Sequence, residues 1–291
     1  MSNIVFFGTE TYSVIALEAL WRAGFSIRLI VTKPDAPRGR GKKPTAPAVK
    51  QFALNHGIPV LQPATLNEII PAITALDSPV GVLVAYGKII PESIIGLFTP
   101  GIINIHPSLL PLYRGPSPVE SAIINQDSKT GVTIMKLEKA MDAGPIYLQA
   151  PYALDHSETK PELYTTLFTL GANLLTTELP TIISGKRKPI PQNENLATYC
   201  HLLTKSDGEL HPQNVTASQA EAQIRAHIHY PRTRLSIGSH SIIATKAHVT
   251  HEQKTLLDIA CKNSTFLSID ELIAPSGNTM SAAAFLRGYS I

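Results

Sequence analysis

The sequence contains few of the residues that mark a secreted, disulfide-stapled protein. Its 291 residues include only two cysteines, Cys200 and Cys261, which lie far apart and show no metal-type spacing. Two thiols in a chain of this length do not make a disulfide framework. The scarcity of cysteine therefore predicts a protein of the reducing cytoplasm.

Long apolar runs and targeting signals are also missing. No stretch reaches the roughly 18 uninterrupted apolar residues that a membrane-spanning helix needs. The first residues, MSNIVFFG, lack the basic start and the longer apolar core of a signal peptide. We expect neither export nor a membrane span, and the lack of an obvious apolar seam favours a monomer.

Strong net charge is absent, and so are several familiar site motifs. A formal charge of +3 is too small to imply a polyanionic partner by itself, although a pI near 8.8 permits one. Gly8-Thr9-Glu10-Thr11 is not a dinucleotide fingerprint, and there is no Gly-x-Ser-x-Gly elbow and no metal-ligand cluster. These absences disfavour hydride transfer and a metal mechanism.

The first half of the chain alternates short apolar runs with amphipathic segments. The predicted buried strands are Asn3–Gly8, Ile27–Thr32, Val80–Ala85 and Ile102–Ile105. The predicted helices are Tyr12–Ala23, Pro47–His56, Leu66–Leu76 and, later, Pro161–Ser184. Strands that alternate with helices predict an α/β domain with a doubly wound, mostly parallel sheet, which binds ligands at the carboxyl ends of its strands.

The pattern changes after the last of these helices. A charged and then proline- and asparagine-rich stretch follows residue 185 and is typical of a linker. Beyond it the strand-like runs are Leu235–Ile237, Ser241–Val249, Thr255–Ala260 and Leu272–Ile273. We therefore expect a first domain over residues 1–185, a linker over 186–200 and a small OB-like β-barrel over 201–291.

One predicted strand carries polar residues into an apolar run, in the stretch INIHPSLLPLYRG that begins at Ile103. Asn104 and His106 are two residues apart, so their side chains should project from the same face, just before Pro107 ends the strand. An imidazole can move a proton, and a carboxamide can hydrogen-bond a developing oxyanion. The alternative is that both residues only satisfy buried backbone groups.

A second motif, AMDAGPI, places Asp142 in a turn of small residues. A carboxylate held beside His106 would orient the imidazole ring and favour its charged form. On its own, an Asp in such a turn is more often an Asx-type turn residue than a functional one.

The third motif is the segment KPDAPRGRGKKP over residues 33–44, whose prolines and glycines predict a loop without helix or strand. A basic loop beside the carboxyl ends of the strands suits a phosphate-rich partner, although many basic loops are only solvated. The segment 33–44 lacks the residue spacing of a Walker phosphate-binding loop, and it has no aromatic residues between its basic ones that could stack on bases.

Taken together, these motifs resemble the folate-dependent formyltransferases, in which a strand supplies Asn-x-His-x-Ser-Leu-Leu-Pro and a later turn supplies an Asp. The resemblance implies that Asn104, His106 and Asp142 are catalytic and that 10-formyltetrahydrofolate is the formyl donor, with no metal. It also implies a set of folate-lining residues from SLLP and AYGKII: Ser108, Leu109, Leu110, Pro111, Tyr86, Ile89 and Ile90.

Over its whole length, the chain is most similar to the members of the family that formylate the methionine of an initiator tRNA for translation initiation. This resemblance rests on the basic loop, on LATYCHLLTKSDGEL and on the C-terminal MSAAAFLRGY. It implies that methionyl-tRNA contacts the loop through Arg38, Arg40, Lys42 and Lys43. Two alternatives stay open: a formyltransferase for a sugar-nucleotide amine, and a tRNA- or folate-binding protein without turnover.

Overall fold

A computed structural model describes residues 3–38 and 43–291. The chain divides into two compact units. The first comprises the residues up to Pro116 together with Thr130–Tyr152 and Tyr164–Tyr199. The second comprises Ser117–Lys129, Ala153–Leu163 and Cys200–Ile291, so it draws on three separate stretches of the chain.

The first unit is built on a seven-stranded sheet with the strand order β5-β2-β1-β6-β7-β8-β9. The pairs from β5 to β7 are parallel, and β8 runs antiparallel to β7. The strands are β1 (Asn3–Gly8), β2 (Ser26–Val31), β5 (Val60–Leu61), β6 (Val80–Val84), β7 (Ile102–His106), β8 (Lys129–Lys136) and β9 (Ile146–Ala153). The expected mostly parallel sheet is confirmed.

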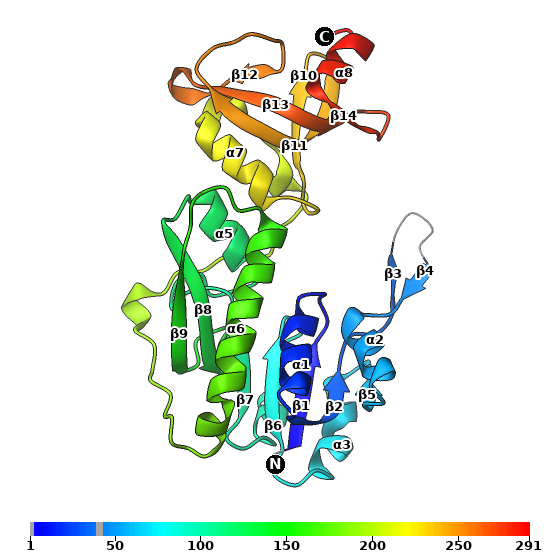
Figure 1. The fold of residues 1–291 in the computed structure, drawn as a ribbon, viewed down its shortest axis with the longest axis vertical. Helices are drawn as coiled ribbons and strands as arrows, with labels where there is room; N and C mark the ends of the chain where they lie inside the picture. The colour runs from blue at the N-terminus through cyan, green and yellow to red at the C-terminus, as the bar shows by residue number, and fades with distance from the viewer. Residues whose placement is uncertain (1–2, 39–42) are drawn as a thin grey trace. The chain divides into compact units, whose positions relative to one another are not determined.

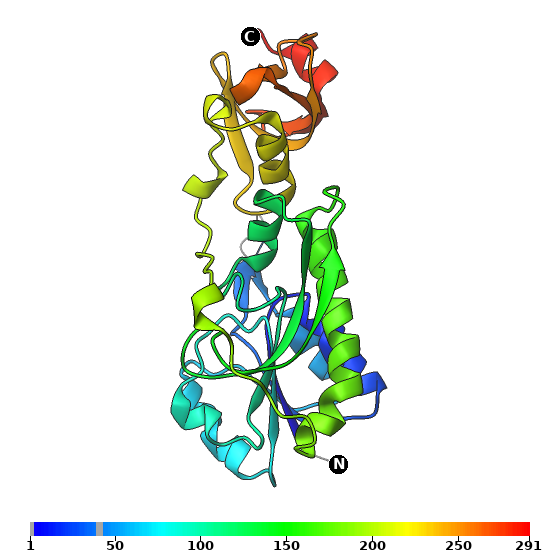
Figure 2. The ribbon, with the colours of Figure 1, turned by 90° about the vertical axis from the view of Figure 1, so that its left-hand side faces the viewer.

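Helices cover both faces of this sheet. They are α1 (Ser13–Arg22), α2 (Ala48–Asn55), α3 (Ile70–Thr74), α4 (Glu92–Ile95) and α6 (Lys160–Ile183). In β1, Ile4 and Phe6 belong to a core with residues of α1, α2 and α6, whereas Val5 and Phe7 belong to a second core with residues of α3 and α4. This period of two buries the side chains of β1 from Ile4 to Phe7 on both faces, as expected for a strand inside a doubly wound sheet. Figure 2 shows the two layers of helices on opposite sides of the sheet.

Two predicted segments of the first unit differ in the structure. The expected helix Leu66–Leu76 is a 3-10 helix, η1 (Leu66–Ile69), followed by the short α3, and Pro71 stands at the start of α3, where a proline is tolerated. The basic segment expected to lack strands instead forms a hairpin of β3 (Ala36–Arg38) and β4 (Lys43–Thr45) (Figure 1). That expectation was wrong because both strands of a two-stranded ribbon are edge strands, where Pro37 and Pro44 can pair across from each other.

The second unit contains a five-stranded antiparallel sheet. Its strands are β10 (Thr233–Ile237), β11 (His240–Thr250), β12 (Asp258–Ala260), β13 (Phe266–Ile273) and β14 (Thr279–Ser281). They pack with α7 (Ala217–Ala226) and α8 (Ala282–Gly288) around one apolar core. The expected β-rich C-terminal domain is therefore confirmed, and β13 is longer than predicted because its buried residues Leu267 and Ile269 continue the apolar alternation.

The helix α5 (Pro118–Ile124) belongs to the second unit and packs against α7. Ser218 of α7 donates a hydrogen bond to Gln126, just past α5, and Arg225 of α7 donates one to the carbonyl oxygen of Glu158. Lys160 forms an ion pair of 2.9 Å with Glu120 in the same unit. These contacts explain why residues 117–129 and 153–163 group with the C-terminal sheet.

Candidate active site

Asn104 and His106 lie on β7, near the middle of the large sheet, and each is 5% exposed. Ile103 and Ile105 pack into the core that includes α1 and α6. Because side chains alternate along a strand, Asn104 and His106 share the opposite face. Because β7 ends at His106, both residues also lie at the carboxyl end of the strand, where ligands bind in sheets of this kind.

The imidazole of His106 faces an oxygen at each ring nitrogen. Nε2 lies 2.9 Å from the carbonyl oxygen of Tyr113, and Nδ1 lies 3.7 Å from Oδ2 of Asp142. A carbonyl only accepts hydrogen bonds, so the contact with Tyr113 fixes a proton on Nε2. Nδ1 is then the atom that can take up or release a proton beside the carboxylate.

Asp142 is held in the turn between β8 and β9. Its backbone has a φ of +48°, in the left-handed region, and its Oδ2 accepts a hydrogen bond of 2.8 Å from the backbone N–H of Gly115. At Gly144 a Cβ atom would overlap the carbonyl oxygen of Lys136, so only glycine fits there. The structure thus brings the predicted Asp142 next to the predicted His106.

The carboxamide of Asn104 differs from the other two groups. It is buried, yet it forms no hydrogen bond with any residue of 3–38 or 43–291. Buried amides normally have partners, because burying a polar group without one costs free energy. The Asn104 carboxamide is therefore available to a ligand.

The predicted folate residues Ser108–Pro111 are fixed against β8. Ser108 donates a hydrogen bond of 2.6 Å to the carbonyl oxygen of Leu112, and Thr133 donates one of 2.7 Å to the carbonyl oxygen of Ser108. Leu109 lies against Gly131, Leu110 is buried, and the carbonyl oxygen of Pro111 accepts a hydrogen bond from Thr198. The hydrogen of the Ser108 hydroxyl is therefore already bonded within the turn.

The other predicted folate residues follow β6. Tyr86 and Ile90 are buried in the core that includes α3 and α4, whereas Ile89 is 80% exposed. The buried hydroxyl of Tyr86 has no hydrogen-bond partner in the described part of the chain, and burial raises the pKa of Tyr86 to about 12. Of these three residues, only Ile89 has a solvent-exposed side chain.

The predicted tRNA residues are only partly described. Lys43 is exposed on β4, and Arg38 ends β3. Arg40 and Lys42 lie outside the described residues.

A cleft of about 370 Å³ lies at the base of the hairpin, lined by Thr9, Glu10, Lys33, Asp35 and Lys88 among others. The carboxylate of Asp35 is bound by Gln62 and Lys50, whose hydrogen bonds hold its pKa below the usual value. Lys33 belongs to the basic segment 33–44, whereas Lys88 was not among the residues predicted to bind a ligand. These two lysines line the cleft together with the carboxylates of Glu10 and Asp35.

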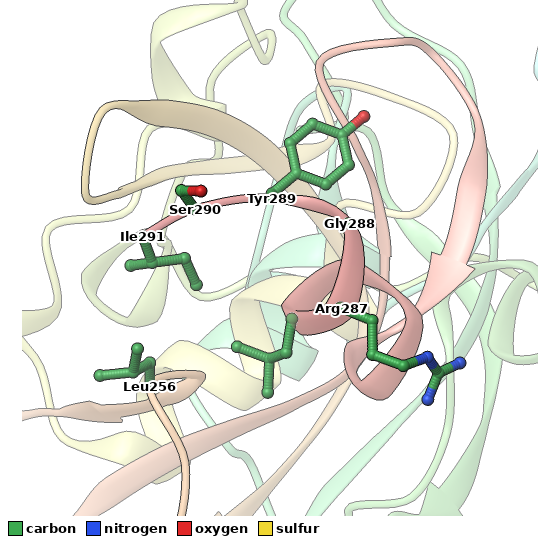
Figure 3. Close-up of a pocket in the computed structure, with 7 residues that line it drawn as sticks. Leu256, Arg287, Gly288, Tyr289, Ser290 and Ile291 are labelled. Carbon is green, nitrogen blue, oxygen red and sulfur yellow. The ribbon is translucent and has the colours of Figure 1, made fainter.

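The second unit has a hollow of its own, of about 340 Å³, beside α8 (Figure 3). Leu256, Leu286 and Ile291 contribute apolar side chains to it, while the guanidinium of Arg287 points away from Leu256 and Ile291. We assign no chemistry to this hollow.

Metal-binding clusters and membrane-spanning helices are both absent from the described residues. Within residues 3–38 and 43–291 no group of three or more His, Cys, Asp and Glu side chains could hold a metal ion. Over the same residues, no helix has both the length and the apolar character needed to cross a membrane.

Comparison with known protein families agrees with this geometry. The family described as formyl transferase matches residues 2–179, and the formyl transferase C-terminal domain matches residues 202–290. The chain belongs to the formyl transferase family. The resemblance inferred from INIHPSLLPLYRG and AMDAGPI is thereby confirmed, and this formyltransferase has both domains of its family.

Among its relatives are proteins named methionyl-tRNA formyltransferase. The one from Roseiflexus castenholzii is 40% identical over 302 aligned residues, which cover 98% of this chain and 96% of the relative. The one from Chloroflexus aggregans is 46% identical over 210 residues, covering 72% of this chain and 68% of the relative. The similarity extends through both domains in the first case.

Solved structures share the fold at lower identity. The N-formyltransferase of Helicobacter canadensis, in complex with folinic acid and dTDP-3-aminofucose, has a TM-score of 0.69 at 20% identity and covers 94% of this chain. HypX of Aquifex aeolicus in complex with tetrahydrofolic acid has a TM-score of 0.67 at 14% identity, and the match covers 97% of this formyltransferase and 46% of HypX. At these identities the likeness establishes the fold.

Proposed function

We propose that this enzyme transfers the formyl group of 10-formyltetrahydrofolate to the free amino group of initiator methionyl-tRNA, in the cytoplasm and as a monomer. The observation that carries the choice of acceptor is the 40% identity to a methionyl-tRNA formyltransferase over 98% of the chain. In this proposal residues 1–185 are the catalytic domain, 186–200 the linker and 201–291 the tRNA-binding domain.

The reaction requires an oxyanion site and a route for a proton. The amino nitrogen of methionine attacks the formyl carbon, a tetrahedral oxyanion forms, and the bond from that carbon to the folate nitrogen then breaks. One proton must leave the attacking amine, and one must reach the departing folate nitrogen. Both needs are met by side chains that can donate hydrogen bonds to an oxyanion and exchange protons.

Three residues are assigned to these tasks. The Asn104 carboxamide, which lacks a partner among the described residues, donates to the oxyanion, and the imidazolium of His106 supports it. Asp142, 3.7 Å from Nδ1, keeps the ring oriented and organises a water that relays the protons. Hydrogen bonds at active sites often tighten only when substrate is bound, so a distance of 3.7 Å is compatible with this role.

The folate donor is assigned to the segments that flank these residues. Ser108, Leu109, Leu110 and Pro111 line one side of its site, and Tyr86, Ile89 and Ile90 the other. A flat pterin ring suits an apolar pocket with a few polar groups. The Tyr86 hydroxyl is a fully buried polar atom without a partner in the described residues, and Asn104 offers a carboxamide that no described residue binds, as expected of a site that receives a ligand.

The tRNA is assigned to the basic hairpin. Arg38, Arg40, Lys42 and Lys43 would contact phosphates of the acceptor stem, because lysine and arginine are the residues that neutralise a nucleic-acid backbone. The cleft at the base of the same hairpin places Lys33 and Lys88 where they could contact further phosphates.

The test is formyl transfer from 10-formyltetrahydrofolate to three acceptors measured side by side: initiator methionyl-tRNA, elongator methionyl-tRNA and a 4-amino sugar nucleotide. The variant His106→Ala is the blank. Product on the initiator tRNA alone supports the proposal. Product on the sugar nucleotide alone overturns the choice of acceptor, and no product on any acceptor overturns enzymatic formyl transfer.

A further inference from the structure

The side chain of Gln192 joins the segment after α6 to the turn that carries Asp142. Its Nε2 donates a hydrogen bond of 2.7 Å to the carbonyl oxygen of Asp142 and another of 2.7 Å to that of Gly144. Its Oε1 accepts two hydrogen bonds from Arg114, of 3.0 Å from Nε and 2.8 Å from Nη2. The oxygen and the nitrogen of this carboxamide thus both form hydrogen bonds beside the candidate catalytic residues.

The chemistry of the partners fixes how this carboxamide is oriented. Arg114 can only donate hydrogen bonds, and the two carbonyl oxygens can only accept them. The amide oxygen must therefore face Arg114, and the amide nitrogen must face the turn. Only a side chain with both an acceptor and a two-proton donor satisfies the two sides at once.

Arg114, to which Gln192 is hydrogen-bonded, is itself buried and held by several side chains. The side chain of Arg114 is 1% exposed and forms a two-pronged pair with Glu194, with distances of 2.7 and 2.8 Å. It also donates a hydrogen bond of 3.0 Å to the hydroxyl of Tyr199. The bond with Glu194 is the main reason why the pKa of Arg114 is raised, which keeps the guanidinium charged.

The backbone of the same segment is tied down as well. Ile190 and Ile146, the first residue of β9, exchange two hydrogen bonds of 2.8 Å, and the N–H of Arg114 donates one of 2.8 Å to the carbonyl oxygen of Thr198. Backbone hydrogen bonds thus join the stretch 190–199 to the start of β9 and to Arg114, although its composition is that of a linker.

The turn needs such support because of its conformation. A left-handed φ at a residue other than glycine costs on the order of 1 kcal/mol and persists only where the surroundings enforce it. Gln192 holds the backbone of Asp142, and the N–H of Gly115, the residue after Arg114, holds its carboxylate. Both contacts act on Asp142, whose carboxylate lies beside His106.

We propose that Gln192 is a positioning residue for formyl transfer: anchored by Arg114, its amide nitrogen holds the backbone of the turn so that the Asp142 carboxylate stays beside Nδ1 of His106. This inference rests on the function proposed above. Gln192 does not touch the reacting atoms, so its loss lowers turnover and leaves the binding of folate and tRNA intact.

The decisive variant is Gln192→Glu. Its carboxylate still accepts from Arg114 but cannot donate to the carbonyl oxygens of Asp142 and Gly144. Gln192→Ala removes both sets of hydrogen bonds. Asn193→Ala is the matched control, because Asn193 is the neighbouring residue and, within residues 3–38 and 43–291, its side chain accepts a hydrogen bond only from the N–H of exposed Asn195. The measurements are kcat, the KM for each substrate and the melting temperature.

We expect Gln192→Glu and Gln192→Ala to lose roughly tenfold to a hundredfold in kcat, as is typical when a supporting hydrogen bond to a reactive group is removed. Both KM values should stay within about threefold of wild type, and Asn193→Ala should match wild type. Gln192→Glu keeps its hydrogen bonds to Arg114 but sets a carboxylate oxygen against two carbonyl oxygens, so it should melt below wild type and still fold at the assay temperature.

A Gln192→Glu variant with wild-type kcat would overturn the inference while leaving the proposed function in place. So would a loss confined to the KM for tRNA, which would mean that the segment only arranges the tRNA-binding part. If Gln192→Ala fails to fold, Gln192→Met, which fills a similar volume without hydrogen bonds, takes its place with the same expected loss in kcat. Wild-type protein that formylates no acceptor would overturn the function and the inference together.

Discussion

The Asp142 carboxylate lies 3.7 Å from Nδ1 of His106 and is held there by a hydrogen bond of 2.8 Å from the N–H of Gly115. The other nitrogen of the ring, Nε2, is 2.9 Å from the carbonyl oxygen of Tyr113. His106 is thus fixed between two acceptors, and both partners come from turns rather than from its own strand. The Asp142 carboxylate can therefore be changed without altering the large sheet.

The first prediction concerns the charge of Asp142. Asp142→Asn keeps an oxygen for the N–H of Gly115 but removes the negative charge beside His106. We expect kcat to fall on the order of a hundredfold, comparable to the loss of one oxyanion-hole donor, with KM for both substrates little changed. Steady-state kinetics at saturating folate and tRNA measure this. Asp77→Asn, at an exposed carboxylate of the same unit, is the control, and an equal loss there would argue against a specific role for Asp142.

The second prediction concerns the close approach at Gly144. In Gly144→Ala the new Cβ overlaps the carbonyl oxygen of Lys136, so the turn with Asp142 must move. We expect a lower free energy of unfolding and a lower kcat, because a shifted carboxylate no longer orients His106. Gly288→Ala, where an added Cβ meets nothing within 4 Å, should change neither quantity. Urea unfolding and turnover report the two effects, and normal turnover in Gly144→Ala would contradict the account of this turn.

The third prediction concerns the basic hairpin. Replacing Arg38, Arg40, Lys42 and Lys43 with alanine together should raise the KM for methionyl-tRNA far more than the KM for the folate donor. It should also make the tRNA KM less dependent on salt, because fewer counterions are released when the tRNA binds. Arg22→Ala, an exposed arginine in the last turn of α1, is the control. Equal increases in both KM values would remove the hairpin from tRNA recognition.

The fourth prediction concerns His227, at the end of α7. The ring is 2% exposed, and neither nitrogen has a hydrogen-bond partner in the described part of the chain. Burial, helped by Lys160 and opposed by Asp207, lowers the pKa of His227 to about 4. In the unfolded chain a histidine titrates near 6.5, so the unfolded state gains a proton first as the pH falls.

The contribution of neutral His227 to stability is therefore complete above about pH 6.5 and is lost as the pH falls toward about 4, a change of about 3 kcal/mol. Urea unfolding near pH 7.5 and again near pH 5 should show a larger loss of stability on acidification in wild type than in His227→Leu. His251→Leu, at an exposed histidine, is the matched control. Equal losses in wild type and His227→Leu would contradict the burial of a neutral ring.

The parts of the site that follow a local period could be predicted from the sequence. The alternation along β7 placed Asn104 and His106 on one face, and the alternation of strands with helices gave the doubly wound sheet. The role of Asp142 came from a family resemblance, because no local rule places a turn residue beside a strand nearly forty positions earlier.

Other features depend on contacts that no local pattern encodes. Gln192 and Arg114 are 78 residues apart, and the polar composition around Gln192 is that of any linker. The burial of His227 depends on how α7 packs, and the β3–β4 hairpin pairs two prolines that ordinarily argue against strands. In each case tertiary packing overrides the local composition.

The most direct test of the account is the turnover of His106→Ala with initiator methionyl-tRNA and 10-formyltetrahydrofolate, both at saturating concentrations. We predict a kcat at least on the order of a hundredfold below wild type, because both the stabilisation of the oxyanion and the transfer of the proton depend on this ring. Near-normal turnover in His106→Ala would remove the His106–Asp142 pair from the chemistry and contradict the central claim.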